Sequence, residues 1–240
     1  MVDRPILFSG PMIRALLDGR KTQTRRTLPI AADLQKKITR FVNVGTETAT
    51  GRSVYEMRDS GGGHIRIPAG KHFEDAHFMP RIAVNDRLWV KETHAIVPRT
   101  AYRMSEGVQQ TLRPNDAHDA AVYREGWERS QPGRWRPSIH MPRWASRLTL
   151  TVTDVRIERL QDCSDDDAEA EGITRYSDGW HWEANKEGFA RYFGATPQQA
   201  YLGLWSIING RDSLDANPWV VAYTFTVHRG NIDQGGRVAA

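Results

Sequence analysis

The segment RLTLTVTDVRIERL, residues 147–160, carries the clearest strand pattern in the chain. Leucine or valine at 148, 150 and 152 alternates with threonine at 149, 151 and 153, the period of a strand with one buried face. Directly after it, Ser164 precedes three aspartates, a pattern typical of a helix start, and Gly172 favours a stop. We therefore predict a strand over 147–160 followed by a short helix over 165–171.

Caps, breakers and hydrophobic periodicity predict the remaining regular elements. They are a helix over 10–18, a turn and short strand through 20–26, a strand over 88–96, helical spacing at Phe189, Tyr192 and Phe193, a helix from 197 to 209 and a strand over 219–227.

Two long segments lack these signals, and we interpret residues 29–83 and 97–133 as irregular inserts, the second with a short strand at 121–124. Residues 229–240 have little to bury and are expected to form a flexible tail. Short strands with few helices favour an α+β fold built on a small β-barrel with flanking helices and two long inserts, in one domain over 1–228.

Composition excludes several classes of protein. The chain has 240 residues, 39% of them hydrophobic, and no run approaches the ~20 apolar residues of a membrane-spanning helix. The N-terminus lacks the pattern of a secretory leader. Cys163 is the single cysteine, so neither an internal disulfide nor a cysteine-based zinc site can form. These features favour a reducing compartment, and we expect a cytoplasmic protein without membrane contact.

Charge is unevenly distributed along the chain. Residues 1–28 hold six Lys or Arg against two acids, and residues 134–159 repeat that balance. Residues 160–187 hold nine acids against two basic residues. The two basic segments could approach a phosphate backbone, whereas the acidic segment would avoid it.

Lys21 and Thr24 form a candidate base and nucleophile, because a lysine deprotonated by burial can activate a hydroxyl group. Glu171 is a candidate general acid or base. The alternatives are a solvated basic turn for Lys21 and one more exposed acid for Glu171. No close histidine pair of the HExxH type, glycine-rich phosphate loop or Gly-x-Ser-x-Gly motif is present, so we predict neither metal nor cofactor.

Residues 134–147 interleave arginines with Trp135 and Trp144. Cations next to stackable rings are typical of sites for single strands or flipped bases. The alternative is that the tryptophans pack inward and leave arginines at the rim.

Four blocks resemble the ASCH-domain family, named after activating signal cointegrator homology and related to the PUA fold. They are FSGPMIRALLDGRKTQTRR (8–26), DRLWVKET (86–93), IHMPRWASRLTLTVTDVRIERLQDCSDDDAEAEGI (139–173) and LWSIING with NPWVVAYTF (204–225). The larger ASCH proteins of phages and prophages are especially similar. The resemblance implies a PUA-like barrel and an association with RNA or modified bases.

Small bacterial members of this family hydrolyse N4-acetylcytidine with a Lys, Thr and Glu set. Their motif Gly-x-Lys-Thr-x-Thr-x-Arg matches residues 19–26, which implies Lys21 as base, Thr24 as nucleophile and Arg26 as a phosphate or ribose contact. Their Ala-Glu-x-Glu segment matches residues 168–171, which implies Glu171 as proton donor. Trp135 or Trp144 would stack on the base. The two inserts have no counterpart in the small enzymes, so pocket and substrate can differ.

The sequence thus predicts hydrolysis of the N-acyl amide of a modified pyrimidine nucleoside or nucleotide, without cofactor. The alternative is a non-catalytic module that binds single-stranded RNA, DNA or a modified base, and a ribonuclease is a third hypothesis. The acyl group, a free or polymeric substrate, and the oligomeric state stay open.

Overall fold

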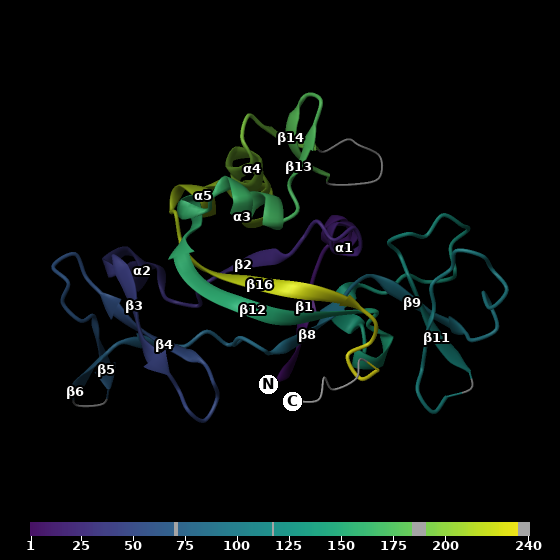
Figure 1. Ribbon diagram of the computed structural model, residues 1–240, viewed down its shortest axis with the longest axis horizontal. Coiled ribbons are helices and arrows are strands. Elements are labelled where there is room, and N and C mark those ends of the chain that lie inside the picture. Colours follow the sequence, from purple (N-terminus) through teal and green to yellow (C-terminus); the bar gives the residue numbers. More distant parts are fainter. Residues whose placement is uncertain (70–71, 117, 184–190, 235–240) are drawn as a thin grey trace.

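The computed structural model describes residues 1–69, 72–116, 118–183 and 191–234, and it has an α+β fold, as predicted. A mixed five-stranded sheet forms its centre, and helices and smaller sheets surround it (Figure 1). In spatial order its strands are β1 (Asp3–Leu7), β8 (Arg87–Lys91), β12 (Leu148–Arg159), β16 (Trp219–Arg229) and β2 (Gln23–Thr27). Within the described residues β1 and β2 are free edges, so the sheet is open and not a closed barrel.

The long antiparallel ladder of β12 and β16 organises this sheet. Leu148 pairs with Arg229 at one end and Arg159 with Trp219 at the other, with a bulge between Val152 and Asp154. The even positions 148, 150 and 152 of β12 are fully buried, as their alternation predicts. They pack with Ile13 and other apolar residues into the core between the sheet and α1 (Gly10–Leu17).

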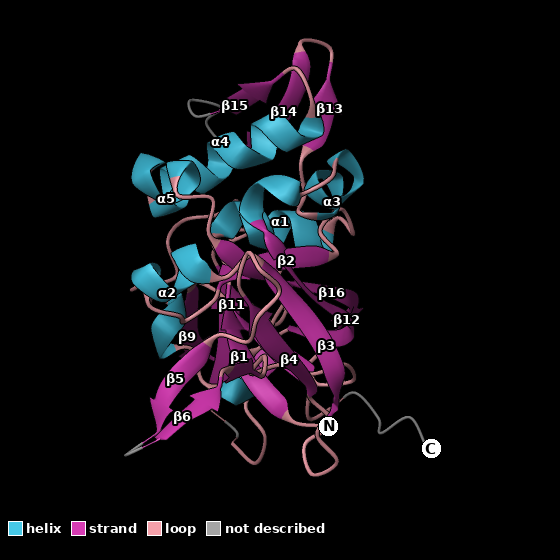
Figure 2. Cartoon of the chain, turned by 90° about the vertical axis from the view of Figure 1, so that its left-hand side faces the viewer, coloured by secondary structure: helices cyan, strands magenta, loops and turns pink. Residues whose placement is uncertain are grey.

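Helices cover the edge of the sheet at which β2 lies (Figure 2). They are α1, α3 (Asp165–Ala170), α4 (Pro197–Asn209) and α5 (Arg211–Asp215). Ser164 Oγ accepts a hydrogen bond from the Asp167 amide at 3.1 Å, and Thr196 Oγ1 accepts one from the Gln199 amide at 3.2 Å, so α3 and α4 each begin at a side-chain N-cap. The helices predicted over 10–18, 165–171 and 197–209 are confirmed.

A three-stranded sheet packs against α4. Its strands are β13 (Thr174–Tyr176), β14 (Gly179–Glu183) and β15 (Arg191–Gly194). The helical spacing predicted at 189–193 is wrong for the described part, because Tyr192 and Phe193 pair with β14 in a strand; Phe189 lies outside the described residues. Pairing with a neighbouring strand outweighs a short aromatic spacing.

The first insert, 29–83, is not irregular as predicted. It contains α2 (Ala32–Lys37), β3 (Arg40–Thr46), β4 (Ser53–Arg58), β5 (Arg66–Ala69), β6 (His72–Asp75) and β7 (His77–Phe78). Ile38, Met57 and Ile65 form its core and pack against Trp219 and Val221 of β16. The apolar core of the insert therefore includes residues of the central sheet.

The predicted strand 88–96 is two strands in different sheets, because the chain leaves the central sheet after Lys91. β9 (His94–Pro98), β10 (Thr111–Leu112) and β11 (Asp119–Tyr123) form a separate sheet, and β11 confirms the short strand predicted within the second insert. We name residues 94–136 the β9–β11 lobe. It lies at the opposite end of the molecule from the first insert (Figure 1).

The end of the described chain is anchored, which corrects the predicted flexible tail for residues 229–234. Asn231 donates to the carbonyls of Arg143, Trp144 and Ser146 at 2.8 to 3.0 Å, and Ile232 is buried. Residues 235–240 lie outside the described part. The remaining helical segments are single turns at Ser138–His140, Arg143–Ala145 and Leu160–Asp162.

Candidate functional site

The turn after α1 places Lys21 beneath the C-terminal end of α3. Gly19 takes a φ of +74°, a conformation that favours glycine, and ends the helix. The Lys21 amide then donates to the Ala15 carbonyl at 3.0 Å and the Thr22 amide to the Ala170 carbonyl at 2.8 Å. The strand β2 begins at Gln23, so Lys21 lies between the turn at 18–19 and the strand, whereas Thr24 lies within the strand.

Lys21 contacts Glu171 directly. The distance from Lys21 Nζ to Glu171 Oε2 is 2.5 Å, and that from Nζ to the Glu171 carbonyl oxygen is 2.9 Å. The two side chains are 1% and 4% exposed. Burial lowers the pKa of Lys21, although the Glu171 carboxylate opposes that shift. The site therefore holds a lysine that gives up its proton more easily than a free lysine, in direct contact with a carboxylate.

Gly172 allows this close approach. Its φ is +103°, and a Cβ atom at this position would lie 3.1 Å from Ala15 Cβ and 3.6 Å from Lys21 Cβ. A larger residue would strain the backbone and crowd α1. The glycine thus allows the C-terminal end of α3 to pack closely against the segment that contains Lys21.

Arg25 binds the other oxygen of the same carboxylate, at 3.3 Å from Glu171 Oε1. Its guanidinium also lies 2.7 Å from Glu158 and 3.1 Å from Asp167. Burial disfavours its charge, but the carboxylates of Glu171 and Glu158 are among the groups that raise the pKa of Arg25, Glu171 most strongly. Tyr201 of α4 places its hydroxyl group 3.4 Å from Glu171 Oε1, and its ring lies 5.6 Å from the Arg25 guanidinium carbon. Glu171 is therefore held from three directions.

Thr24 is 1% exposed and lines a cleft of about 100 Å³ together with Glu171 and Tyr201. Arg26 also lines this cleft; it is exposed, and its guanidinium donates to the Leu7 carbonyl at 3.0 Å. The remaining lining residues are Met12, Arg25, Thr27, Leu204, Trp205, Ile208 and Asn209. The cleft thus has a polar end at β2 and apolar walls from α1 and α4.

Four of the six predicted site residues therefore lie together. Lys21 and Glu171 are in contact, and Glu171 shares the cleft with Thr24 and Arg26.

Trp135 and Trp144 lie elsewhere. Trp135 packs in the β9–β11 lobe, with its ring 5.7 Å from Trp127, and Trp144 packs against the cluster of Tyr123 and Met141. Neither lines the cleft, so the structure does not bring them to Thr24.

Sequence reasoning missed Arg25 and Tyr201. Arg25 has a signal in the strand period, because residues two apart along β2 share a face and Gln23, like Arg25, reaches Asp167. No such sequence signal marks Tyr201, because its spacing fits the apolar face of α4 and therefore predicts a core residue.

In the described ranges no group of three or more His, Cys, Asp or Glu side chains is arranged to hold a metal ion. The longest described helix, α4, has 13 residues, and none of the described helices could span a bilayer.

Comparisons of the chain with family models, with curated proteins and with solved structures found no match. The function of this protein is therefore inferred from the site itself.

Proposed function

We propose that this protein hydrolyses the N-acyl amide of a modified pyrimidine nucleoside or nucleotide of the N4-acetylcytidine type. The observation that carries the proposal is the buried contact of Lys21 with Glu171 beside a cleft that Thr24 lines. We also propose that the open sheet and its helices are a form of the PUA-like fold that the sequence resembles.

A proton transfer within the Lys21–Glu171 pair prepares both catalytic groups. If the proton moves from Nζ to Oε2 across 2.5 Å, Lys21 becomes a neutral amine and Glu171 a carboxylic acid. Lys21 then takes the Thr24 hydroxyl proton while Oγ attacks the acyl carbon, and Glu171 protonates the nitrogen as the C–N bond breaks. The amine leaves, and the acyl group stays on Thr24 as an ester.

Water completes the cycle. It attacks the acyl carbon and gives a proton to the Glu171 carboxylate, and Lys21 returns a proton to Thr24 Oγ as the ester bond breaks. The free acid leaves. Lys21 and Glu171 are then neutral again, so atoms and charges balance over the two steps.

The size of the cleft indicates which part of the substrate it takes. Its volume of about 100 Å³ is smaller than the ~300 Å³ typical of a pocket for a whole ligand. The acyl amide would enter, and the sugar or phosphate would remain at the mouth near the exposed Arg26. This favours a small acyl group.

The test is turnover of N4-acetylcytidine and of bulkier N4-acyl-cytidines, followed by absorbance. Lys21→Met and Thr24→Val should each lower kcat by about 10²- to 10⁴-fold, the usual contribution of a positioned base or nucleophile. Lys36→Met, at an exposed lysine of α2, is the matched control and should retain full activity. Equal turnover in wild type and both site variants, or no turnover of any amide by folded protein, would contradict the proposal.

A further inference from the structure

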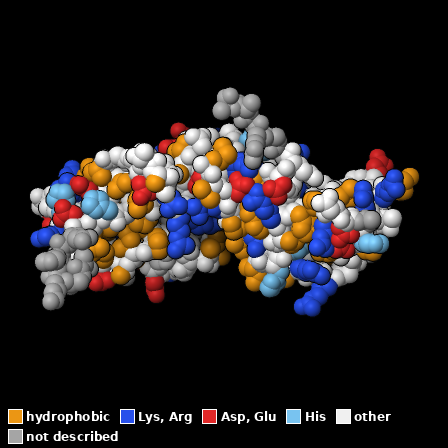
Figure 3. Space-filling model, turned by 90° about the horizontal axis from the view of Figure 1, so that it is seen from below, with side chains coloured by type: hydrophobic (Ala, Val, Ile, Leu, Met, Phe, Trp, Pro, Cys, Tyr) orange, Lys and Arg blue, Asp and Glu red, His pale blue; other side chains and the backbone are white. Residues whose placement is uncertain are grey.

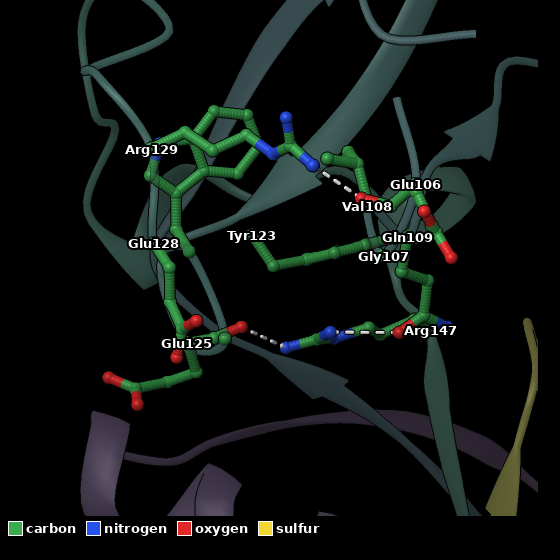
Figure 4. Close-up of a pocket in the computed structure, with 11 residues that line it drawn as sticks. Glu106, Gly107, Val108, Gln109, Tyr123, Glu125, Glu128, Arg129 and Arg147 are labelled. Atoms are coloured by element: carbon green, nitrogen blue, oxygen red, sulfur yellow. Dashed lines mark hydrogen bonds between the residues drawn. The ribbon is translucent and has the colours of Figure 1, made fainter. Parts of the chain in front are cut away.

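A second cavity, of about 510 Å³, lies in the β9–β11 lobe (Figure 4). It opens between the loop 106–109 and the loop 125–129, and Arg129 crosses from one loop to the other to donate to the Glu106 carbonyl. None of the described residues that line it also lines the cleft of Thr24. The cavity belongs to an insert and is separate from the proposed catalytic site.

Contacts of Arg147 within the protein fix the floor of this cavity. The Arg147 guanidinium stacks 4.1 Å from the Tyr123 ring centre and binds both oxygens of Glu92 at 2.8 Å. It also donates to Gln109 Oε1 at 2.8 Å and to the Glu125 carbonyl at 3.1 Å. One buried arginine therefore ties both loops to the central sheet, and the cavity is preformed.

One wall is aromatic. Trp127 is packed edge to face against Tyr102 and Trp135, with ring centres 5.0 and 5.7 Å away, and its indole N–H donates to the Ser130 carbonyl at 3.0 Å. The ring is only partly buried. A ring held in this way offers a stacking surface at little conformational cost.

The rim carries acceptors for hydrogen bonds. Glu125 is already bound by Arg14 at 2.5 Å. Glu106 is exposed, and within the described ranges its carboxylate has no side-chain partner. A carboxylate in this place accepts hydrogen bonds from an amino group and repels a phosphate. A ligand would therefore present its amino-bearing part to the cavity.

Three exposed arginines lie beside the cavity. Arg124 lies 5.8 Å from the Trp135 ring, and Arg134 and Arg136 flank that tryptophan in the chain. All three are exposed, and in the described part of the chain none has a carboxylate partner. Residues 91–147 hold ten Lys or Arg against six acids, a net charge of +4 that equals that of the whole chain. Lys and Arg side chains are visible over this end of the molecule (Figure 3).

We propose that the cavity takes an unpaired base of a single-stranded nucleic acid whose backbone contacts Arg124, Arg134 and Arg136. The base would stack on Trp127 and donate an exocyclic amino group to Glu106, while the phosphates meet the arginines outside the acidic rim. A base within a duplex cannot enter a cavity between two loops. This site is independent of the chemistry proposed at Thr24.

The experiment is the anisotropy of labelled 12-nucleotide single strands, titrated across a range of salt concentrations. The triple variant Arg124→Gln, Arg134→Gln, Arg136→Gln should bind more weakly and should lower the slope of log K against log salt by about 2, at ~0.7 for each lost phosphate contact. The control triple Lys36→Gln, Lys37→Gln, Arg40→Gln removes the same charge from exposed positions of the first insert and should leave the slope unchanged. Equal effects of the two triples, or no binding by wild type at low salt, would overturn the proposal.

A second measurement tests the cavity itself. Wild type should prefer oligo(C) and oligo(A) to oligo(U), because uracil has no amino group to donate to Glu106. Glu106→Ala, at an exposed position, should abolish this preference and keep the salt slope, whereas a preference that survives the change would place the base elsewhere. Because binding is measured without turnover, Thr24→Val should bind as wild type does, and failure of the hydrolase proposal would leave this result intact.

Discussion

Lys21 Nζ lies 2.5 Å from Glu171 Oε2 although 150 residues separate them in the chain. The contact depends on α1 and α3, whose ends meet where the Thr22 amide binds the Ala170 carbonyl. A charged pair so deeply buried costs desolvation free energy that a surface pair does not. The catalytic role that we propose explains why such a pair lies at the end of a cleft.

Removing one partner of this pair should be more harmful than removing both. Lys21→Met leaves Glu171 buried with Arg25 as its remaining cation, and we expect the free energy of unfolding to fall by about 3–5 kcal/mol. The double variant Lys21→Met, Glu171→Leu should recover much of that loss. Urea denaturation of the single and double variants measures both values; a double variant less stable than either single one would contradict the expected coupling.

Activity should fall at high pH, where the Lys21–Glu171 pair loses its proton. The proposed mechanism needs one proton on this pair, because Lys21 must be neutral to act as the base while Glu171 must hold a proton to act as the acid. Burial lowers the pKa of Lys21 below the usual 10.5, so the plot of kcat/KM against pH should fall at an apparent pKa below that value, which belongs to the coupled pair. Lys21→Arg keeps the charge but not the base, because arginine stays protonated below pH ~12, and it should be inactive over the whole range. A plot that stays level or still rises up to pH 10.5 would contradict this role.

The sequence predicted those elements whose pattern is local. The alternation along β12 and the Ser164 cap of α3 are visible in a few residues. The split between β8 and β9 was not, because residues 91–94, where the chain changes sheets, include no glycine or proline that would mark a break. In the first insert, β3 was missed because it exposes most of both its faces and so lacks a period of two.

The same limit applies to the site. No spacing in the sequence relates Lys21 to Glu171, and only the family resemblance predicted that the two residues share a site. The positions of Trp135 and Trp144 depend on how the second insert folds, which no local pattern specifies. Arg25 was within reach of sequence reasoning, because the period of β2 places it on the face of Gln23.

Cys163 should be inert towards thiol reagents in the folded protein. It is fully buried, and burial raises its pKa to about 12, although Arg25 opposes that shift. At pH 8 only about 10⁻⁴ of the thiol is then ionised, and the thiolate is the reactive form. We expect no reaction with a chromogenic disulfide within an hour and one equivalent after denaturation. Rapid native labelling would show that α3 opens readily.

Arg147→Met should loosen the β9–β11 lobe and leave the rest of the fold in place. The substitution leaves the Glu92 carboxylate, 2% exposed, without its cation and frees the loops at Gln109 and Glu125. A buried charge left without its partner costs about 3–5 kcal/mol of stability, and here the loss falls on the contacts where the lobe joins β12. Limited proteolysis should then cut within 99–133 before it cuts elsewhere, whereas the control Arg103→Met, at an exposed arginine of the same lobe, should be digested as wild type is. Because Lys21, Thr24 and Glu171 lie on other elements, Arg147→Met should retain amide hydrolysis while it weakens oligonucleotide binding; parallel loss of both would show that the lobe and the cleft fold as one unit.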